Sequence, residues 1–181
     1  MAARRKKTRR RQARSPGAAL SHVETGASGP QSRMVDVGRK PVTARSALAR
    51  ARLRFPAGIL RRVLDAGGPK GPVTEVARAA GILAAKRTSD LIPMCHSLGL
   101  DHVEIRFEPE SGRDPRELEV LCRASLRGRT GVEMEALVGA AVAALAVYDM
   151  VKALDHGITI EKVELLEKSG GRSGSWTRNG R

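Results

Sequence analysis

Residues 128–152 read Gly-Arg-Thr-Gly-Val-Glu-Met-Glu-Ala-Leu-Val-Gly-Ala-Ala-Val-Ala-Ala-Leu-Ala-Val-Tyr-Asp-Met-Val-Lys. Apolar residues recur here at helical spacing, with Ala and Gly filling much of the remainder. This pattern predicts a helix over about residues 132–154 that packs closely on a sheet. The residues that set the spacing are Met134, Leu137, Val138, Ala141, Leu145 and Tyr148. The few polar residues of this helix are therefore candidates for function.

Asp149 and Lys152 are the first such candidates, because residues three apart share one face of a helix. They are separated by roughly 4.5 Å along the helix axis, so both side chains can reach one small ligand. The alternative is an ordinary surface ion pair that contributes on the order of a few tenths of a kcal/mol to stability. Spacing alone leaves both interpretations open.

A second polar group, Glu133 and Glu135 with Met134 between them, lies at the start of the same helix. Glu135 precedes Asp149 by fourteen residues, which restores almost the same helical phase but separates the two by roughly 21 Å if the helix is continuous. One small substrate cannot bridge that distance. If both groups act together, either the helix begins after Glu135 or a second subunit brings one group to the other. We favour the second subunit.

The composition fits one domain and a basic tail. The chain has 181 residues and a formal net charge of +14, of which residues 1–33 hold nine Lys or Arg and one Glu. We expect residues 1–33 to be disordered and to suit nonspecific contact with polyanions. The aromatic side chains are few, so there is little material for stacking on nucleic-acid bases. They are Phe55, Phe107, Tyr148 and Trp176.

Two cysteines, Cys95 and Cys122, make neither a disulfide framework nor a zinc ligand set, which favours a reducing compartment. No window reads as a membrane span, and the N-terminus lacks the apolar segment of a secretory signal. We therefore expect a soluble, cytoplasmic protein that has no contact with membranes.

The first half of the chain predicts a short strand at residues 34–37 and a helix over residues 43–54, capped by Thr43. A second short helix follows Pro56, with its apolar residues turned inward. These are Ile59, Leu60, Val63 and Leu64. A Gly- and Pro-rich turn over residues 65–72 then places Lys70 on a constrained loop, and a further helix is expected over residues 73–85.

The second half predicts a hairpin of two alternating strands, residues 102–107 and 117–124, and a last strand at residues 158–166. The order strand, helices, strand, strand, helix, strand indicates an α+β fold: a ferredoxin-like antiparallel sheet with helices packed on one face. The other sheet face must also be covered, which favours a homo-oligomer.

Residues 86–98 mix polar and apolar residues without a period, as site-lining segments do. His96 is the best single acid-base candidate because histidine titrates near neutrality, although a structural role is equally open. A nucleophilic pair of Cys95 and His96 is not favoured, since adjacent side chains usually point apart. We expect no metal site, because metal-ligating residues are not clustered.

Residues 168–174, Lys-Ser-Gly-Gly-Arg-Ser-Gly, combine glycines that expose backbone N–H groups with Lys168 and Arg172, a composition suited to phosphate. The segment is not a Walker loop, and a flexible tail is the alternative. The basic candidates outnumber the acidic ones, Glu133, Glu135 and Asp149. This balance indicates an anionic, phosphorylated small molecule handled by acid-base chemistry. The basic candidates are Lys70, Lys86, Arg87, Lys152, Lys168 and Arg172.

Five motifs in this order resemble the cyclic pyranopterin monophosphate synthases, the family of molybdenum cofactor biosynthesis protein C. They are Met34-Val-Asp-Val-Gly38; Lys70-Gly71; Ala84-Ala-Lys-Arg-Thr-Ser-Asp-Leu-Ile-Pro-Met-Cys-His96; Thr130-Gly-Val-Glu-Met-Glu-Ala-Leu137 with Tyr148-Asp-Met-Val-Lys152; and Lys168-Ser-Gly-Gly-Arg-Ser-Gly174. The resemblance divides the chain into a tail at 1–33, a synthase domain at 34–174 and a flexible C-terminal tail at 175–181.

The resemblance implies conversion of 3′,8-cyclo-7,8-dihydroguanosine 5′-triphosphate to cyclic pyranopterin monophosphate with release of pyrophosphate, without a cofactor. It implies catalytic roles for Asp149, Lys70 and Lys152. It further implies a homohexamer built as a trimer of dimers, with sites at dimer interfaces. The substrate-binding residues that it implies are Met94, Cys95, His96, Glu133, Met134, Glu135, Lys168 and Arg172.

Two positions depart from the family pattern. Lys-Gly-Asp becomes Lys70-Gly71-Pro72, which removes an acid near Lys70, and Cys-His-Pro becomes Cys95-His96-Ser97. Pro72 is compatible with the first turn of a helix. Two other functions stay open: a nucleic-acid-binding module recruited through the basic tail, and another enzyme of phosphorylated ligands on the same scaffold.

Overall fold

The computed structural model of the protein describes residues 23–26 and 29–178. The chain forms two compact units, Met1–Val35 and Asp36–Arg181. In the first, β1 (Val23–Gly26) and β2 (Gly29–Ser32) pair as an antiparallel hairpin. This hairpin lies within residues 1–33, which we expected to be disordered. The expectation of disorder does not fit the residues that pair in the hairpin. Residues 1–22 of the predicted tail lie outside the described residues.

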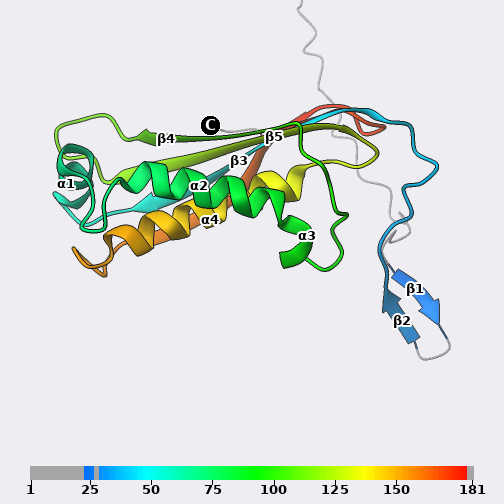
Figure 1. The fold of residues 1–181 in the computed structure, drawn as a ribbon, viewed down its shortest axis with the longest axis horizontal. Helices are drawn as coiled ribbons and strands as arrows, with labels where there is room; N and C mark the ends of the chain where they lie inside the picture. Colours follow the sequence, from blue (N-terminus) through cyan, green and yellow to red (C-terminus); the bar gives the residue numbers. More distant parts are fainter. Residues whose placement is uncertain (1–22, 27–28, 179–181) are drawn as a thin grey trace, which may run out of the picture. The chain divides into compact units, whose positions relative to one another are not determined.

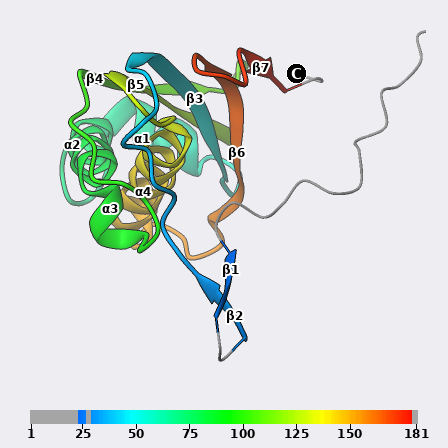
Figure 2. The same cartoon turned by 90° about the vertical axis from the view of Figure 1, so that its right-hand side faces the viewer.

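The second unit is a five-stranded antiparallel sheet with its long helices on one face (Figures 1 and 2). Its elements in chain order are β3 (Thr43–Arg54), α1 (Ile59–Ala66), α2 (Val73–Lys86), α3 (Thr88–Leu91), β4 (His102–Pro109), β5 (Glu117–Gly128), α4 (Glu133–Val151), β6 (Thr159–Ser169) and β7 (Trp176–Thr177). The spatial order is β4-β5-β3-β6-β7. With β3, β4, β5 and β6 as its four main strands, this is the predicted ferredoxin-like arrangement, which is confirmed.

The first strand of that arrangement was predicted wrongly. Residues 43–54 form the central strand β3, not a helix, and no strand is formed by residues 34–37. Ala and Arg favour helices intrinsically, which explains the error. In the sheet, Ala47, Ala49, Ala51 and Leu53 enter the main core, and the residues between them, Leu48, Arg50 and Arg52, lie on the other face. Tertiary packing on both sides of β3 therefore overrides the local preference.

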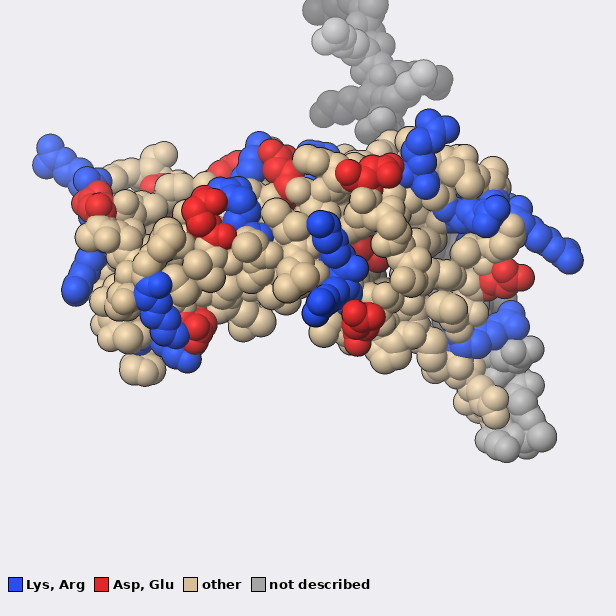
Figure 3. Space-filling model, in the orientation of Figure 1, with Lys and Arg blue, Asp and Glu red and all other residues tan. Residues whose placement is uncertain are grey.

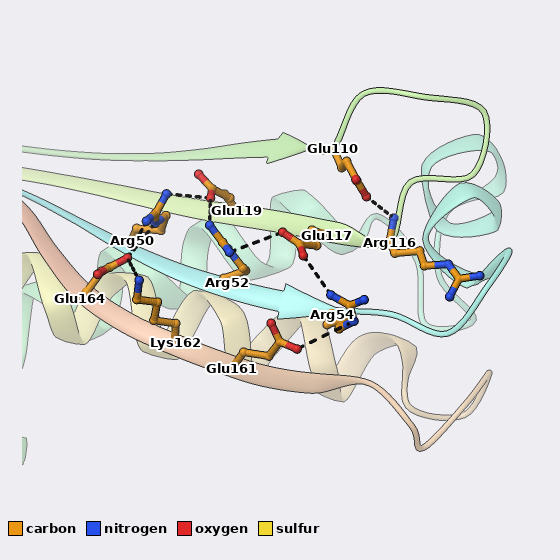
Figure 4. Close-up of polar contacts among 10 residues, drawn as sticks. All are labelled: Arg50, Arg52, Arg54, Glu110, Arg116, Glu117, Glu119, Glu161, Lys162 and Glu164. Atoms are coloured by element: carbon orange, nitrogen blue, oxygen red, sulfur yellow. Dashed lines mark hydrogen bonds and ion pairs between the residues drawn. The ribbon is translucent and has the colours of Figure 1, made fainter. Parts of the chain in front are cut away.

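Arg50, Arg52 and Arg54 of β3 lie on the sheet face opposite the helices, where glutamates of neighbouring strands meet them (Figure 4). Arg52 stands directly opposite Glu119 of β5, and Arg50 directly opposite Glu164 of β6. Arg50 Nη2 donates to Glu164 Oε1 at 2.5 Å, and its Nη1 donates to Glu119 Oε1 at 2.8 Å. Beside this ladder Leu48, Leu121 and Leu166 form a small second core.

Helix α4 is the continuous helix that its sequence predicted. Its small residues allow close packing against β3, β5, β6 and α2. A Cβ on Gly139 would lie 2.6 Å from Cys122 Sγ, so no larger residue fits there. By length and composition α4 is apolar enough to cross a membrane, contrary to our expectation that no window would be. It is nonetheless the core helix of this fold, and 56% of its most apolar window is buried.

The remaining predicted elements are present. The helix of residues 73–85, the hairpin and the last strand correspond to α2, β4 with β5, and β6. In α1, Leu60 and Val63 are buried as expected, but Leu64 is 44% exposed and does not face the core. Residues 176 and 177, expected to be flexible, pair with β6 as β7. Residues 179–181 of that predicted tail lie outside the described residues.

Candidate functional site

Asp149 lies between two lysines at the C-terminal end of α4. Lys70 Nζ donates to Asp149 Oδ2 at 2.7 Å, and Lys152 Nζ approaches Asp149 Oδ1 at 2.8 Å. Lys152 is three residues further along the chain, whereas Lys70 comes from the α1–α2 loop. The structure thus joins the three residues that the sequence analysis selected as catalytic. All three side chains are about half exposed and open to a ligand.

Glycines hold Lys70 at this position. Gly68 and Gly71 exchange backbone hydrogen bonds across the two-residue turn of Pro69 and Lys70. A Cβ on Gly68 would lie 2.5 Å from Val73 Cγ2 and 3.3 Å from the carbonyl oxygen of Met150. The loop therefore rests directly on the end of α4. Pro72 is the N-cap residue of α2 and makes no side-chain cap hydrogen bond, and the helix starts directly after it at Val73.

The charges of this cluster stabilise one another. The hydrogen bonds from Lys152 and then Lys70 lower the pKa of Asp149 to about 2. The hydrogen bond to Asp149 raises the pKa of Lys152. At neutral pH Asp149 is ionised and Lys152 is protonated. Lys152 can donate a proton, and Asp149 can orient the ammonium groups beside it.

A second cluster surrounds the N-terminal end of α4. Lys168 of β6 donates from Nζ to Glu133 Oε1 at 2.9 Å. Glu135 is only 4% exposed, and its burial, assisted by the charge of Glu133, raises the pKa of its carboxyl group. Burial, together with the charge of Glu135, also raises the pKa of the Cys95 thiol. The segment of Cys95 is thus electrostatically coupled to the start of α4.

The other predicted binding residues sit around this second cluster. Met94 and His96 flank Cys95 in the chain after α3, and Met94 is exposed. Met134 is exposed on the first turn of α4. Arg172 is exposed in the glycine-rich turn that follows Lys168. Each of these residues is therefore at or near the N-terminal end of α4, away from Asp149.

Arg45 of β3 also belongs to the second cluster, although the sequence analysis did not select it. Its Nη2 donates to the carbonyl oxygen of Arg129 at 3.4 Å. Its guanidinium group lies so close to Gly171 that a Cβ there would overlap it. Among the described residues, the buried Arg45 Nε and Thr43 Oγ1 have no hydrogen-bond partner. The sequence analysis did not select Arg45 and Thr43 because it predicted a helix over residues 43–54. Only as a strand does this segment reach the glycine-rich turn.

The two clusters are at opposite ends of one straight element. Because α4 is continuous from Glu133 to Val151, Glu135 and Asp149 are separated by roughly 21 Å along its axis. Within the described part of the chain, no group of three or more His, Cys, Asp or Glu is placed to hold a metal ion. The two clusters instead offer cations, carboxylates and backbone N–H groups.

Comparison with known proteins places this geometry in a family. The model of the MoaC family matches residues 34–171. A cyclic pyranopterin monophosphate synthase of Chloroflexus aggregans is 49% identical over 88% of this chain and 93% of its own length. A synthase of the same name from Thermomicrobium roseum is 49% identical over 89% of this chain and 94% of its own length. One from Desulforapulum autotrophicum is 52% identical over 80% of this chain and 87% of its own length. The chain therefore belongs to the MoaC family.

Proposed function

We propose that this protein is a cyclic pyranopterin monophosphate synthase, a lyase of molybdenum cofactor biosynthesis. It converts 3′,8-cyclo-7,8-dihydroguanosine 5′-triphosphate to cyclic pyranopterin monophosphate and releases pyrophosphate. The observation that carries the proposal is the triad of Lys70, Asp149 and Lys152, joined at 2.7 and 2.8 Å on a chain of the MoaC family. The substrate is thus a small phosphorylated molecule, as the basic candidates suggested.

The residues have separable roles in this reaction. Lys152 is protonated at neutral pH and serves as a proton donor, while Asp149 fixes the positions of both lysines. Around the other end of α4, Lys168, Arg172 and Arg45 bind the phosphate chain together with backbone N–H groups of the glycine-rich turn. Met94, Cys95, His96, Glu133, Met134 and Glu135 contact the remainder of the substrate.

One substrate molecule requires both clusters, and a second copy of the chain supplies the missing one. Helix α4 presents an apolar stripe to solvent between the two clusters, and Leu145 on it is 56% exposed. Figure 3 shows this side of the molecule as largely uncharged surface, interrupted by small groups of charged side chains. The stripe consists of Met134 and Leu145, which are exposed, and Val138, Ala141 and Tyr148, which are half-buried.

Antiparallel pairing of two α4 stripes explains the spacing of the clusters. If the two-fold axis passes between Ala141 and Val142, Asp149 of one chain stands opposite the start of α4 in the other. Each such dimer then has two complete sites, each built from both chains. The proposed assembly is a homohexamer made as a trimer of these dimers, in the cytoplasm. Small residues at the stripe's centre permit the close approach.

The direct test is turnover of purified cyclic substrate, with pterin product and pyrophosphate both measured. The expected result is equal amounts of the two products. Absence of product from folded, oligomeric protein would overturn the proposed function. A different phosphorylated ligand would then have to be sought for the same clusters.

Deletion of residues 1–33 separates this function from a nucleic-acid-binding one. Those residues carry nine of the 33 Lys and Arg, whereas the family match begins at residue 34. The truncated protein should keep full turnover and lose its binding to polyanions such as heparin. Loss of turnover on truncation would make the tail part of the enzyme, contrary to this division of the chain.

A further inference from the structure

The chain after the glycine-rich turn folds back on β6. The turn passes through Gly170, Gly171 and Gly174, all with positive φ, and β7 then pairs Trp176 with Lys168 and Thr177 with Glu167. Residues 167–177 thus form a hairpin, which Figure 2 shows at the edge of the sheet. Residues 172–178 lie beyond the part of the chain that the family model matches. The return strand is therefore a feature of this chain that needs its own explanation.

Arg178 fastens the end of this hairpin. Its backbone N–H donates to the carbonyl oxygen of Leu166 at 2.8 Å, and its Nε donates to that of Leu165 at 2.8 Å. The same Nε is 3.2 Å from Glu164 Oε2. The guanidinium carbon also lies 5.6 Å from the centre of the Trp176 ring, within cation–π range. A two-residue strand has few ladder hydrogen bonds, so these contacts supply much of its attachment.

The anchor of Arg178 is itself fixed. Glu164 is 6% exposed and also contacts Arg50 and Lys162 (Figure 4). Burial opposes its charge, but the hydrogen bonds from Arg50 and Lys162 outweigh burial and lower its pKa. Glu164 thus stays ionised at neutral pH and holds Arg178 against the sheet. Glu164 therefore connects Arg50 of β3 to Arg178 at the end of the hairpin.

The hairpin carries two of the cations assigned to the substrate. Lys168 stands opposite Trp176 in the register, and Arg172 is at the tip of the turn. On its other side the turn touches β3, because a Cβ on Gly170 would overlap the carbonyl group of Ala44. The turn is therefore held by β3 at its tip and by Trp176 and Arg178 at its base. Without the base contacts, the described residues still restrain the turn through β3, through the pair of Lys168 with Glu133 and through the hydrogen bond from the Gly174 N–H to the Gly171 carbonyl oxygen.

We infer that Trp176 and Arg178 are positioning residues, which hold the turn of residues 169–174 in place so that Lys168 and Arg172 meet the phosphate groups of the substrate. This inference rests on the proposed function. Neither residue touches the substrate in this account. They act by reducing the conformational freedom that the turn would otherwise lose when substrate binds.

The test compares full-length Arg178→Ala and Trp176→Ala with the wild type. KM for the cyclic substrate should rise about tenfold in each, the size of one lost charge-assisted hydrogen bond, with kcat changed less. Trp176→Phe, which keeps an aromatic ring under Arg178, should restore most of the affinity. Arg116→Ala is the matched control, because Arg116 is an exposed arginine paired with Asp114 away from both clusters. An unchanged KM in both alanine variants would overturn the inference.

Hydrogen exchange provides a readout independent of activity. Amides of residues 169–174 should exchange faster in Arg178→Ala than in the wild type, while those of α4 keep their protection. Equal loss of protection in α4 would mean a general structural role and would overturn the positioning role. If the wild-type protein showed no turnover, the proposed function would be wrong. The hydrogen-exchange rates of residues 169–174 would then still decide whether Arg178 holds the turn.

Discussion

At the scale of single residues, Asp149 illustrates how an ordinary surface arrangement differs from a site. The pair Asp149 and Lys152 has the spacing of a common helix-surface ion pair, and by itself nothing more is needed to explain it. Lys70 changes this, because it reaches the same carboxylate from a loop 79 residues earlier in the chain. A carboxylate held by two ammonium groups, both half exposed, is arranged for a ligand and adds little to stability.

Asp149→Asn distinguishes a catalytic role from a surface ion pair. Asparagine keeps the shape and removes the charge, so both lysines lose the group that orients them. We expect kcat to fall by about 10²-fold or more, the lower end of what positioned acid-base groups contribute. The measurement is steady-state turnover, with the thermal midpoint as the check on folding. Nearly unchanged activity would reduce the pair to a surface contact.

The pH dependence of Asp149 follows from its lowered pKa of about 2. Its pKa is near 3.9 in an unfolded chain, so its ionised form stabilises the fold at every pH above about 4. That contribution is lost as pH falls through about 2. The Asp149 carboxyl carbon should therefore show no titration midpoint between about pH 3 and pH 8 by NMR. A midpoint near the ordinary pKa of about 3.9 would mean that the lysines do not hold the carboxylate in solution.

At the scale of elements, β3 is the strand on which the second cluster and the core depend. Its apolar residues pack on α4, while Arg50, Arg52 and Arg54 meet glutamates from β5 and β6 on the opposite face. Burial alone would lower the pKa of Arg50, but its bonds to Glu164 and Glu119 raise it. The strand is thus held in register by charge on one face and by packing on the other.

Arg50→Ala tests how much this ladder contributes. It removes a main partner of Glu164, which is 6% exposed, and leaves that buried carboxylate less compensated. Removing one partner of a buried pair costs about 3–5 kcal/mol, so the free energy of unfolding should fall by a similar amount. Urea denaturation measures it. Arg54→Ala, at an exposed pair with Glu117, is the control and should cost about 0–1 kcal/mol. Equal losses for both variants would contradict the special role of Arg50.

At the scale of the whole molecule, the two clusters at opposite ends of α4 pose the main question. The sequence predicted their separation and the continuous helix bears it out. The apolar stripe between them gives a physical reason for pairing, because burying it removes apolar surface from water at about 25 cal/mol per Å². In the proposed dimer, assembly and catalysis are linked, since each site draws residues from both chains.

Mixing two inactive variants tests that link. Asp149→Asn removes the group at one end of α4, and Glu135→Gln removes the buried carboxylate at the other. In a mixed dimer, one site carries both substitutions and the other carries neither, so activity should partly return. The assay is turnover after subunit exchange, confirmed by mass spectrometry. If subunits exchange and no activity returns, both residues serve a site within one chain.

The register of the pairing has its own control. Ala141→Cys places a thiol beside the proposed two-fold axis and should form a disulfide with its own copy under mild oxidation. Met134→Cys, two helical turns away on the same stripe, should not. Cross-linking at residue 134 alone would contradict the antiparallel register.

The sequence by itself determined the elements whose pattern is strong and local. The helix of residues 133–151, the hairpin of β4 and β5 and the last strand follow from periodicity alone, and the motifs that contain Lys70, Asp149 and Lys152 indicated the family. These features need only neighbours in the chain, so they are visible without tertiary structure.

Only the tertiary structure decided the identity of the central strand and, with it, the second cluster. Alanine and arginine favour a helix at residues 43–54, and the partners that make them a strand lie 63 to 123 residues away in the chain. Arg45 reaches the glycine-rich turn for the same reason. Pairing between distant segments sets these positions, and no local pattern encodes it.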